Sequence, residues 1–204
     1  MKVFLFDFDG VVIDTLPIAV ETYNSLLQKY EIPYQFTQDE FAKLFLNNFH
    51  HSLSAIVTDN AIKENILKER AEEYTRRVND FVVFEGMKDV LNQLSQGNKV
   101  IVISSNRTSF IEKLLSSREI DIFSEVLGGD IEKSKVKKIG WQKEEYPDSD
   151  IYYIGDTAGD IKEGKESGVI TVGTTWGFHS PEVVAAENPD YLFHNPLELL
   201  QLLN

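Results

Sequence analysis

The sequence predicts an α/β fold in which helices cover both faces of a parallel sheet and a helical segment is inserted near the N-terminus. Apolar runs rich in β-favouring residues alternate with segments of helical periodicity along most of the chain. The run at 2–6 is apolar without alternation, which is typical of a strand buried on both faces. Residues 16–80, by contrast, carry almost only helical patterns. These observations favour a parallel core that carries a helical insertion.

The helical segment begins soon after the first strand. Apolar residues recur at helical spacing from 16 to 30. Thr37 and Glu40 have the spacing of a capping box, in which each side chain satisfies the backbone N–H of the other residue, so a helix is expected to begin there. We expect Asn60 to cap a further helix that runs to about Val78.

From Gly86 onward the pattern is one of strand–helix units. A helix through Val90 and Leu94 is expected to stop at Gly97, because glycine readily adopts the left-handed backbone that ends helices. Residues 180–182 combine a capping serine, a first-turn proline and a first-turn acid, which together predict a helix start. The expected strands are 99–104, 150–156, 169–173 and 190–193, and further helices are expected after Thr108, through Val136 and Ile139, ending near Gly168 and from Pro196.

The length and this order of elements predict two domains. A chain of 204 residues suits one domain that carries a smaller insertion. We predict an α/β core domain of residues 1–15 and 84–204, and a helical cap domain of residues 16–83.

Composition excludes several classes of function. The chain has 20 basic and 33 acidic residues and a formal net charge of −13, so neither nucleic acid nor an anionic membrane is an expected partner. It has no cysteine, which excludes disulfides, thiolate zinc sites and cysteine nucleophiles. No apolar run approaches the length of a membrane span, and the N-terminal run does not fit a signal peptide, so we expect a cytoplasmic protein. A small anionic substrate remains compatible with this charge.

Chemically active side chains follow the predicted strands. Asp7 and Asp9 come directly after the first strand, Ser104 closes the second, and Asp156 closes the third. Lys135 lies where a helix is expected to open between the last two. Because ligands bind at the carboxyl ends of parallel strands, we expect these side chains to converge at one edge of the sheet.

Carboxylates that lie so close together need a cation. Oxygen ligands from few carboxylates suit Mg²⁺, which is usually shared with a phosphate. Asp7 can then act as a nucleophile on phosphorus, and Asp9 can protonate the leaving oxygen and later act as the base on water. Gly10 permits the turn that brings Asp9 to the leaving group. Asp156 is the second metal carboxylate.

A phosphoryl group also needs donors. Ser104 is expected to bind a phosphoryl oxygen and Lys135 to offset its charge. Ser105 and Asn106 are candidates for the same phosphate site, and they are also well placed to cap the following helix. Asp160 either supports the metal site or only caps its own helix.

Four stretches in this order resemble the motifs of the haloacid dehalogenase-like superfamily. They are "DFDGVVIDT" (7–15), "VIVISSN" (100–106), "EKSKVKKI" (132–139) and "YYIGDTAGDIKEGKESGVITVGTTWG" (152–177). The resemblance is closest to the phosphoglycolate phosphatase-like branch with a small helical cap. It implies a Rossmann-like core, Asp7 as nucleophile, Asp9 as acid and base, and Mg²⁺ bound by Asp7, Asp156 and the Asp9 carbonyl. It also implies Ser104 and Lys135 as the phosphate-binding pair.

The chain departs from the family pattern at three places. Val136 follows Lys135 where the family often has proline, so Lys133 competes with Lys135 for the phosphate. "FEGM" (84–87) lacks the proline usually found before that glycine, and the cap stretch "FLNNFHHS" (45–52) has no clear counterpart in the branch. The role of His50 and His51 in that stretch, and the substrate, therefore stay open.

The leading hypothesis is a Mg²⁺-dependent phosphatase acting on a small phosphorylated metabolite. A phosphomutase similar to β-phosphoglucomutase uses the same motif residues, and a non-catalytic phosphate- or metal-binding module is the alternative from another class. Asp9 argues against a dehalogenase, in which no leaving oxygen needs a proton. Phosphonate hydrolysis would need a cap lysine, for which Lys29 and Lys43 exist without distinguishing features.

Overall fold

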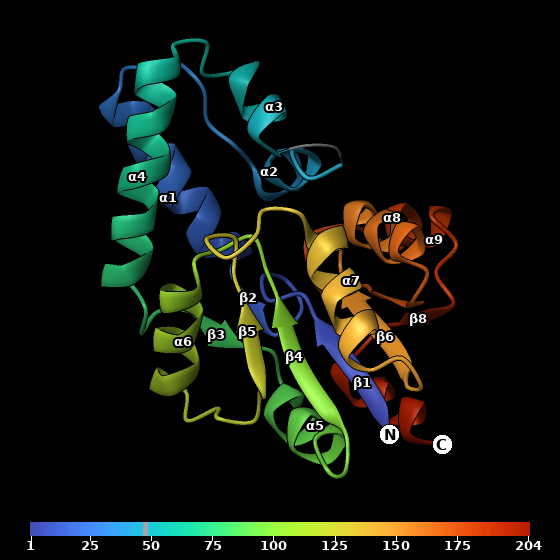
Figure 1. Cartoon of the computed structure of the whole chain (residues 1–204). Helices are drawn as coiled ribbons and strands as arrows, with labels where there is room; N and C mark the ends of the chain where they lie inside the picture. The colour runs from blue at the N-terminus through green and yellow to red at the C-terminus, as the bar shows by residue number, and fades with distance from the viewer. Residues whose placement is uncertain (47–48) are drawn as a thin grey trace.

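The computed structural model describes residues 1–46 and 49–204, and it confirms the predicted α/β fold class. A six-stranded parallel sheet has the strand order β5-β4-β1-β6-β7-β8 (Figure 1). Its strands are β1 (Lys2–Phe6), β4 (Lys99–Ile103), β5 (Glu125–Leu127), β6 (Asp150–Gly155), β7 (Ile170–Thr174) and β8 (Tyr191–Phe193). All six carboxyl ends therefore lie along one edge.

Strand β1 lies inside the sheet between β4 and β6, and its side chains pack on both faces. Phe4 and Phe6 belong to a large apolar cluster on one face, whereas Val3 and Leu5 belong to a smaller cluster on the other. Phe6, at the end of β1, pairs in register with β4 and β6, so three strands end at the same level. This register brings the polar residues that follow them together.

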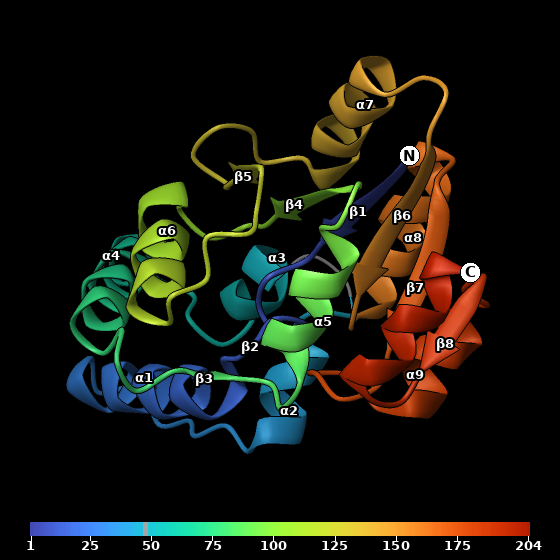
Figure 2. The ribbon, with the colours of Figure 1, turned by 90° about the horizontal axis from the view of Figure 1, so that it is seen from below.

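Helices cover both faces. They are α5 (Met87–Leu94), α6 (Thr108–Ser117), α7 (Lys135–Glu145), α8 (Ala158–Ser167), α9 (Pro181–Ala186) and a 3₁₀ helix, η1 (Pro196–Leu203). Ile139 of α7 packs in the cluster of Val3 and Leu5, whereas Met87 of α5 and Leu199 of η1 pack in the opposite cluster. Figure 2 shows α7 and α5 on opposite faces of the sheet.

A group of four helices interrupts the core after β1. They are α1 (Leu16–Lys29), α2 (Gln38–Lys43), α3 (Phe49–Ser54) and α4 (Asn60–Arg76), and Figure 1 shows them above the carboxyl edge of the sheet. The strands β2 (Ile13–Asp14) and β3 (Val82–Val83) flank the group and pair antiparallel. This short ladder fastens the entry of the helical group to its exit. We retain the proposal that residues 16–83 form a cap and that 1–15 with 84–204 form the core.

Three details differ from the sequence-based expectations. Asp59, not Asn60, caps α4: its carboxylate accepts from the backbone N–H groups of Ala61 and Ile62 at 2.8 and 3.1 Å, because the capping residue must precede the first helical residue. The strands β2, β3 and β5 are not among the expected strands, and the segment from Pro196 is a 3₁₀ helix rather than an α-helix. The capping box at Thr37 and Glu40 is confirmed.

None of the helices in the described ranges has the length and apolar character needed to cross a bilayer.

Candidate active site

A tight turn after β1 presents the first two aspartates. The Asp7 backbone N–H continues the ladder to Ile154, and the Asp7 Oδ1 accepts from the Phe8 N–H at 2.8 Å. Gly10 follows with φ 78°, a conformation that glycine adopts without strain. A Cβ at Gly10 or at Gly177 would also collide with the Asp156 carboxylate. Both glycines therefore let the backbone close around Asp156.

Three buried carboxylates gather behind this turn. Asp7, Asp156 and Asp160 each offer an oxygen, and these oxygens lie within 4.8 Å of one another. The Asp156 Oδ2 accepts from the Phe178 N–H at 2.6 Å, but its Oδ1 is buried and has no hydrogen-bond partner in the described structure. Burial, with the charge of the neighbouring acids, raises the pKa of Asp7 to about 8 and that of Asp156 well above its usual range. A bound divalent cation would reverse this effect, and the all-oxygen donor set fits Mg²⁺.

Lys135 is the cation that the fold itself places in the cluster. Ser134 caps α7 and accepts from the Lys137 N–H at 3.3 Å, so that Lys135 opens the helix at the sheet edge. Its Nζ lies 3.0 Å from the Asp7 Oδ2 and 2.7 Å from the Asp160 Oδ1. Although burial opposes its charge, these two carboxylates hold the pKa of Lys135 well above its usual range. Lys133 lines the adjoining cavity, but Lys135 makes the ion pair with Asp7.

Asp160 anchors Lys135 and also caps its own helix. One oxygen accepts from the Lys135 Nζ and from the Tyr153 hydroxyl, at 2.7 and 2.8 Å. The other accepts from the Thr157 N–H and hydroxyl, at 3.1 and 2.5 Å, in a capping box. Although burial opposes ionisation, the Lys135 charge and these donors lower the pKa of Asp160. Its oxygens are thus already occupied by protein donors.

The loop after β4 places Ser104 differently from the two residues that follow it, and its role as a phosphate ligand stays a prediction. Ser104 is completely buried, and its Oγ accepts from the Asn106 N–H at 3.0 Å. Ser105 and Asn106 line the cavity, and Ser104 does not. Ser104 and Ser105 directly follow β4, and only the second of them lies at the cavity. Both serines of the "SSN" run are candidate phosphate ligands in the sequence. Which of them lies at the cavity depends on the path of the backbone.

Lys138, on the same helix as Lys135, also reaches the loop after β4. It is completely buried, and its Nζ donates to the carbonyl oxygens of Ser104 and Gly128 at 2.6 and 3.3 Å. Burial and the nearby Lys135 charge lower the pKa of Lys138 to about 8. The sequence does contain an indication of this position, because residues three apart in a helix, such as 135 and 138, lie on the same face. Lys138 thereby holds the backbone that follows β4 and β5.

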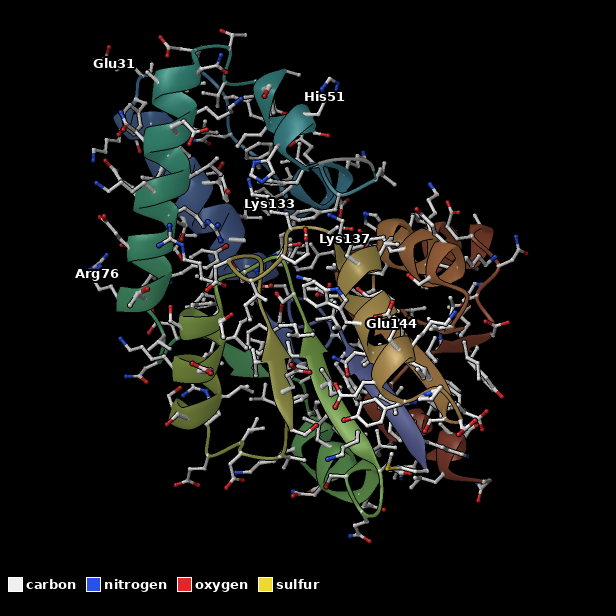
Figure 3. All side chains as sticks on the ribbon, in the orientation of Figure 1. Glu31, His51, Arg76, Lys133, Lys137 and Glu144 are labelled. Carbon is white, nitrogen blue, oxygen red and sulfur yellow. The ribbon has the colours of Figure 1, made fainter. Side chains whose placement is uncertain are left out.

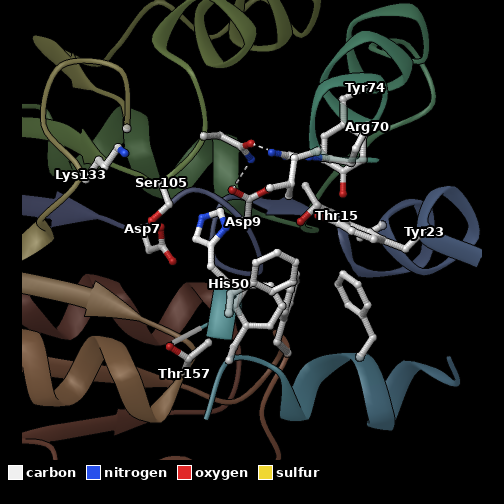
Figure 4. A pocket seen from close by; sticks show the side chains of 18 of the residues that line it. Asp7, Asp9, Thr15, Tyr23, His50, Arg70, Tyr74, Ser105, Lys133 and Thr157 are labelled. Atoms are coloured by element: carbon white, nitrogen blue, oxygen red, sulfur yellow. Dashed lines mark hydrogen bonds between the residues drawn. The ribbon is translucent and has the colours of Figure 1, made fainter. Parts of the chain in front are cut away.

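A cavity of about 750 Å³ lies between the helical group and these loops. Asp7, Ser105 and Lys135 line it, and Figure 4 shows Asp7 beside Ser105. Asp156, whose carboxylate lies close to that of Asp7, is fully buried. Much of the rest of the wall is aromatic or basic, and these residues are Tyr23, Phe41, Phe45, Phe49, His50, Lys63, Arg70, Tyr74, Lys133 and Phe178. The acids Glu64 and Glu163 also line it. The cavity thus has a charged end at Asp7 and Lys135.

Asp9 takes part in a hydrogen-bonded chain that the sequence did not indicate. The Asn106 Nδ2 donates to the Asp9 Oδ2 at 2.7 Å, and the Arg70 Nη1 donates to the Asn106 Oδ1 at 2.8 Å. Burial raises the pKa of Asp9, and the Asn106 amide opposes that rise. Arg70 belongs to α4, far along the chain, and no motif marks it.

The two cap histidines differ in position. His50 lines the cavity, and burial together with the Arg70 and Lys133 charges lowers its pKa. His51 is exposed, and Figure 3 shows it on the side of α3 turned away from the sheet. Asn47 and Asn48, in the same cap stretch, lie outside the described residues.

Comparison with known proteins identifies the family. The sequence model of the haloacid dehalogenase-like hydrolases matches residues 4–174. The chain belongs to this family. The predicted family membership is thus confirmed, and so is the prediction that the protein is a hydrolase.

Individual relatives agree with this assignment. A phosphoglycolate phosphatase of Synechococcus elongatus is 28% identical over 98% of this chain and 96% of its own length. One of Vibrio parahaemolyticus is 25% identical over 100% of this chain and 96% of its own. The solved haloacid dehalogenase-like family protein of Streptococcus pneumoniae has a TM-score of 0.85 at 21% identity, over 100% of this chain and 99% of that one. This last likeness shows a common fold.

Proposed function

We propose that the protein is a Mg²⁺-dependent phosphatase that hydrolyses a small phosphorylated metabolite through an aspartyl-phosphate on Asp7. One observation carries the proposal. Asp7 lies at the end of a cavity, 3.0 Å from the Lys135 Nζ and within reach of Asp156, whose Oδ1 has no hydrogen-bond partner in the described part of the chain. A nucleophilic carboxylate, a fixed cation and a vacant buried carboxylate oxygen are what phosphoryl transfer to an aspartate requires.

The donor set supports Mg²⁺ as the cofactor. Asp7, Asp156 and the backbone carbonyl of Asp9 would hold it, because Mg²⁺ prefers oxygen ligands. When bound, the ion supplies positive charge that offsets the carboxylates and the phosphoryl oxygens. Asp160 is less available as a metal ligand, since its two oxygens already accept hydrogen bonds from Lys135, Tyr153 and Thr157.

The first chemical step uses Asp7 as the nucleophile and Asp9 as the acid. An Asp7 oxygen attacks phosphorus, and the bond from phosphorus to the leaving oxygen breaks. Asp9 gives its proton to that oxygen, which leaves as an alcohol. Lys135 and the donors of Ser105 and Asn106 hold the phosphoryl oxygens during the transfer.

The second step releases phosphate. A water molecule attacks the phosphorus of the aspartyl-phosphate, Asp9 takes the proton of that water, and the bond from phosphorus to Asp7 breaks. Asp7 is thereby regenerated as a carboxylate and Asp9 as an acid.

The relatives indicate where a substrate search should begin. Because two of them carry the name phosphoglycolate phosphatase, phosphoglycolate is the first compound to test. The expected cytoplasmic location stays a prediction.

Hydrolysis of p-nitrophenyl phosphate tests the proposal. We expect turnover with Mg²⁺, loss of turnover with EDTA, and no turnover in Asp7→Asn. Activity that is independent of metal, or full activity in Asp7→Asn, would contradict the mechanism.

A panel of phosphorylated metabolites tests the alternative functions. A hexose phosphate isomerised without release of phosphate would identify a phosphomutase, and inertness toward every ester would identify a binding module.

A further inference from the structure

Arg70 reaches from the helical group to the loops at the sheet edge. It belongs to α4, yet its Nη1 donates to the Oδ1 of Asn106, in the loop after β4, at 2.8 Å. The same amide donates through its Nδ2 to the Oδ2 of Asp9, in the loop after β1, at 2.7 Å. Three segments far apart in sequence thus meet in one chain of hydrogen bonds, drawn as dashed lines in Figure 4.

This series of hydrogen bonds can form in only one direction, from the guanidinium toward the Asp9 carboxyl group. A guanidinium has donors and no acceptor, so Arg70 can bond only to the oxygen of the Asn106 amide. The amide nitrogen is then forced to face Asp9. A carboxyl group that accepts a hydrogen bond at its Oδ2 carries its proton on its Oδ1. Arg70 therefore determines which Asp9 oxygen holds the proton, although the structure records no hydrogen bond between Arg70 and Asp9.

The guanidinium is itself held in place. Its Cζ lies 4.9 Å from the centre of the Tyr74 ring, one turn further along α4. Tyr74 in turn packs against the rings of Phe81 and Phe110, with centroids 5.2 and 5.6 Å away. The position of Arg70 thus depends on how α4 packs against α6, which carries Phe110.

We propose that Arg70 is a positioning residue for proton transfer: through Asn106 it holds Asp9 so that its proton faces the leaving group only when α4 is packed on the core. The inference rests on the proposed phosphatase function. It assigns to the helical group a part in the chemistry as well as in enclosing the cavity.

A second explanation for Arg70 makes a different prediction. Its Nε is buried without a hydrogen-bond partner among the described residues, and the side chain lines the cavity. A direct contact with an acidic group on the substrate would use this atom. Such a contact changes KM for acidic substrates, whereas positioning of Asp9 changes the rate for every substrate whose leaving oxygen needs a proton.

Leaving-group dependence separates these explanations. Steady-state rates are measured with Mg²⁺ for p-nitrophenyl phosphate, ethyl phosphate and phosphoglycolate. We expect Arg70→Met to lower kcat/KM about 100-fold for both alkyl phosphates, which have basic leaving groups, and only about threefold for p-nitrophenyl phosphate, because a positioned acid contributes most where the leaving group is basic. Arg70→Lys, which can still donate to the amide oxygen, should lose less than Arg70→Met.

A double-mutant cycle tests the route through Asn106. If Arg70 acts through that amide, Arg70→Met combined with Asn106→Ala will be no slower than Asn106→Ala alone. Arg76→Met is the matched control, because Arg76 is an exposed arginine of the same helix that pairs with Glu73, and it should keep the wild-type rates.

Three results would overturn the inference. They are equal losses for all three substrates, losses that multiply in the double variant, and a loss confined to KM for phosphoglycolate, which would assign Arg70 to the substrate carboxylate. Thermal unfolding of each variant separates a folding defect from these effects. Failure of the proposed function is distinguishable, because the wild-type protein itself would then not hydrolyse p-nitrophenyl phosphate.

Discussion

At the scale of single residues, one position in the chain separates a fully buried hydroxyl from a hydroxyl at the cavity. Ser104 is buried and accepts from the Asn106 N–H, whereas Ser105 lines the cavity beside Asp7. Lys135 and Lys133 differ in a similar way, since Lys135 pairs with Asp7 and Asp160. Chemical type alone does not distinguish the members of either pair, because the direction of each side chain depends on the backbone around it.

The two serines should therefore respond differently to replacement by alanine. Ser105→Ala removes a donor to the phosphoryl group and should lower kcat/KM on the order of tenfold or more without changing the melting temperature. Ser104→Ala should lower the free energy of unfolding by about 1 kcal/mol, because the Asn106 N–H loses its acceptor. Steady-state kinetics and urea unfolding measure the two effects, and the reverse pattern would contradict the assignment.

At the scale of elements, His179 joins the helical group to the core. Its Nδ1 accepts from the Ala158 N–H at the start of α8, so its Nε2 carries the hydrogen and faces the Ala42 carbonyl of α2, each at 3.0 Å. The rings of Phe45 and Phe178 also meet across the same junction, at 5.1 Å. These contacts place α2 over the loop that holds Asp156.

The His179 contacts predict a pH dependence of stability. Burial lowers the pKa of His179 in the folded state, so the unfolded chain binds its proton more readily. The resulting stability is fully present above the unfolded pKa of about 6.5 and is lost as the pH falls below it. Protonation would also place a donor against the Ala158 N–H.

Thermal unfolding at pH 7.5 and pH 5.5 measures this contribution. We expect His179→Gln to be less stable than the wild-type protein at pH 7.5, by on the order of 1 kcal/mol, and the difference to shrink at pH 5.5. A difference that stays constant across this range would show that His179 does not titrate with folding.

At the scale of the whole molecule, the carboxyl edge of the sheet concentrates like charges that the rest of the fold must compensate. Lys135 offsets part of this charge, yet burial still raises the pKa of Asp7 to about 8. A carboxyl whose folded pKa lies above its unfolded value contributes stability at low pH and loses it as the pH rises through the folded pKa. Without a bound metal ion, the free energy of unfolding should therefore fall as the pH rises from about 4 to about 8.

Magnesium should reverse that weakening. Because the ion binds the folded chain, a concentration 100 times its dissociation constant should stabilise the protein by about 2.7 kcal/mol. The shift in melting temperature should be larger at pH 9 than at pH 6, since the ion competes with protons on Asp7 and Asp156. Asp156→Asn should abolish most of the shift, and a shift of equal size in that variant would contradict this site. Calorimetry with and without Mg²⁺ measures it.

The sequence by itself determined the fold class and the positions of Asp7, Asp9 and Asp156. These follow from local information, since an apolar run ends where a strand leaves the core, and parallel strands bring their carboxyl ends to one edge. The helix start at Thr37 is equally local. The site roles of these residues remain predictions until the variants are measured.

The tertiary structure decided what depends on contacts between distant segments. It placed Ser105 rather than Ser104 at the cavity, paired Lys135 with Asp7, and brought Arg70 to the Asn106 amide beside Asp9. No local pattern encodes these choices, because each depends on the path of a loop and on the packing of a helix against another part of the chain. The physical reason is that strand polarity places a backbone position, whereas only packing sets the direction of the side chain that acts there.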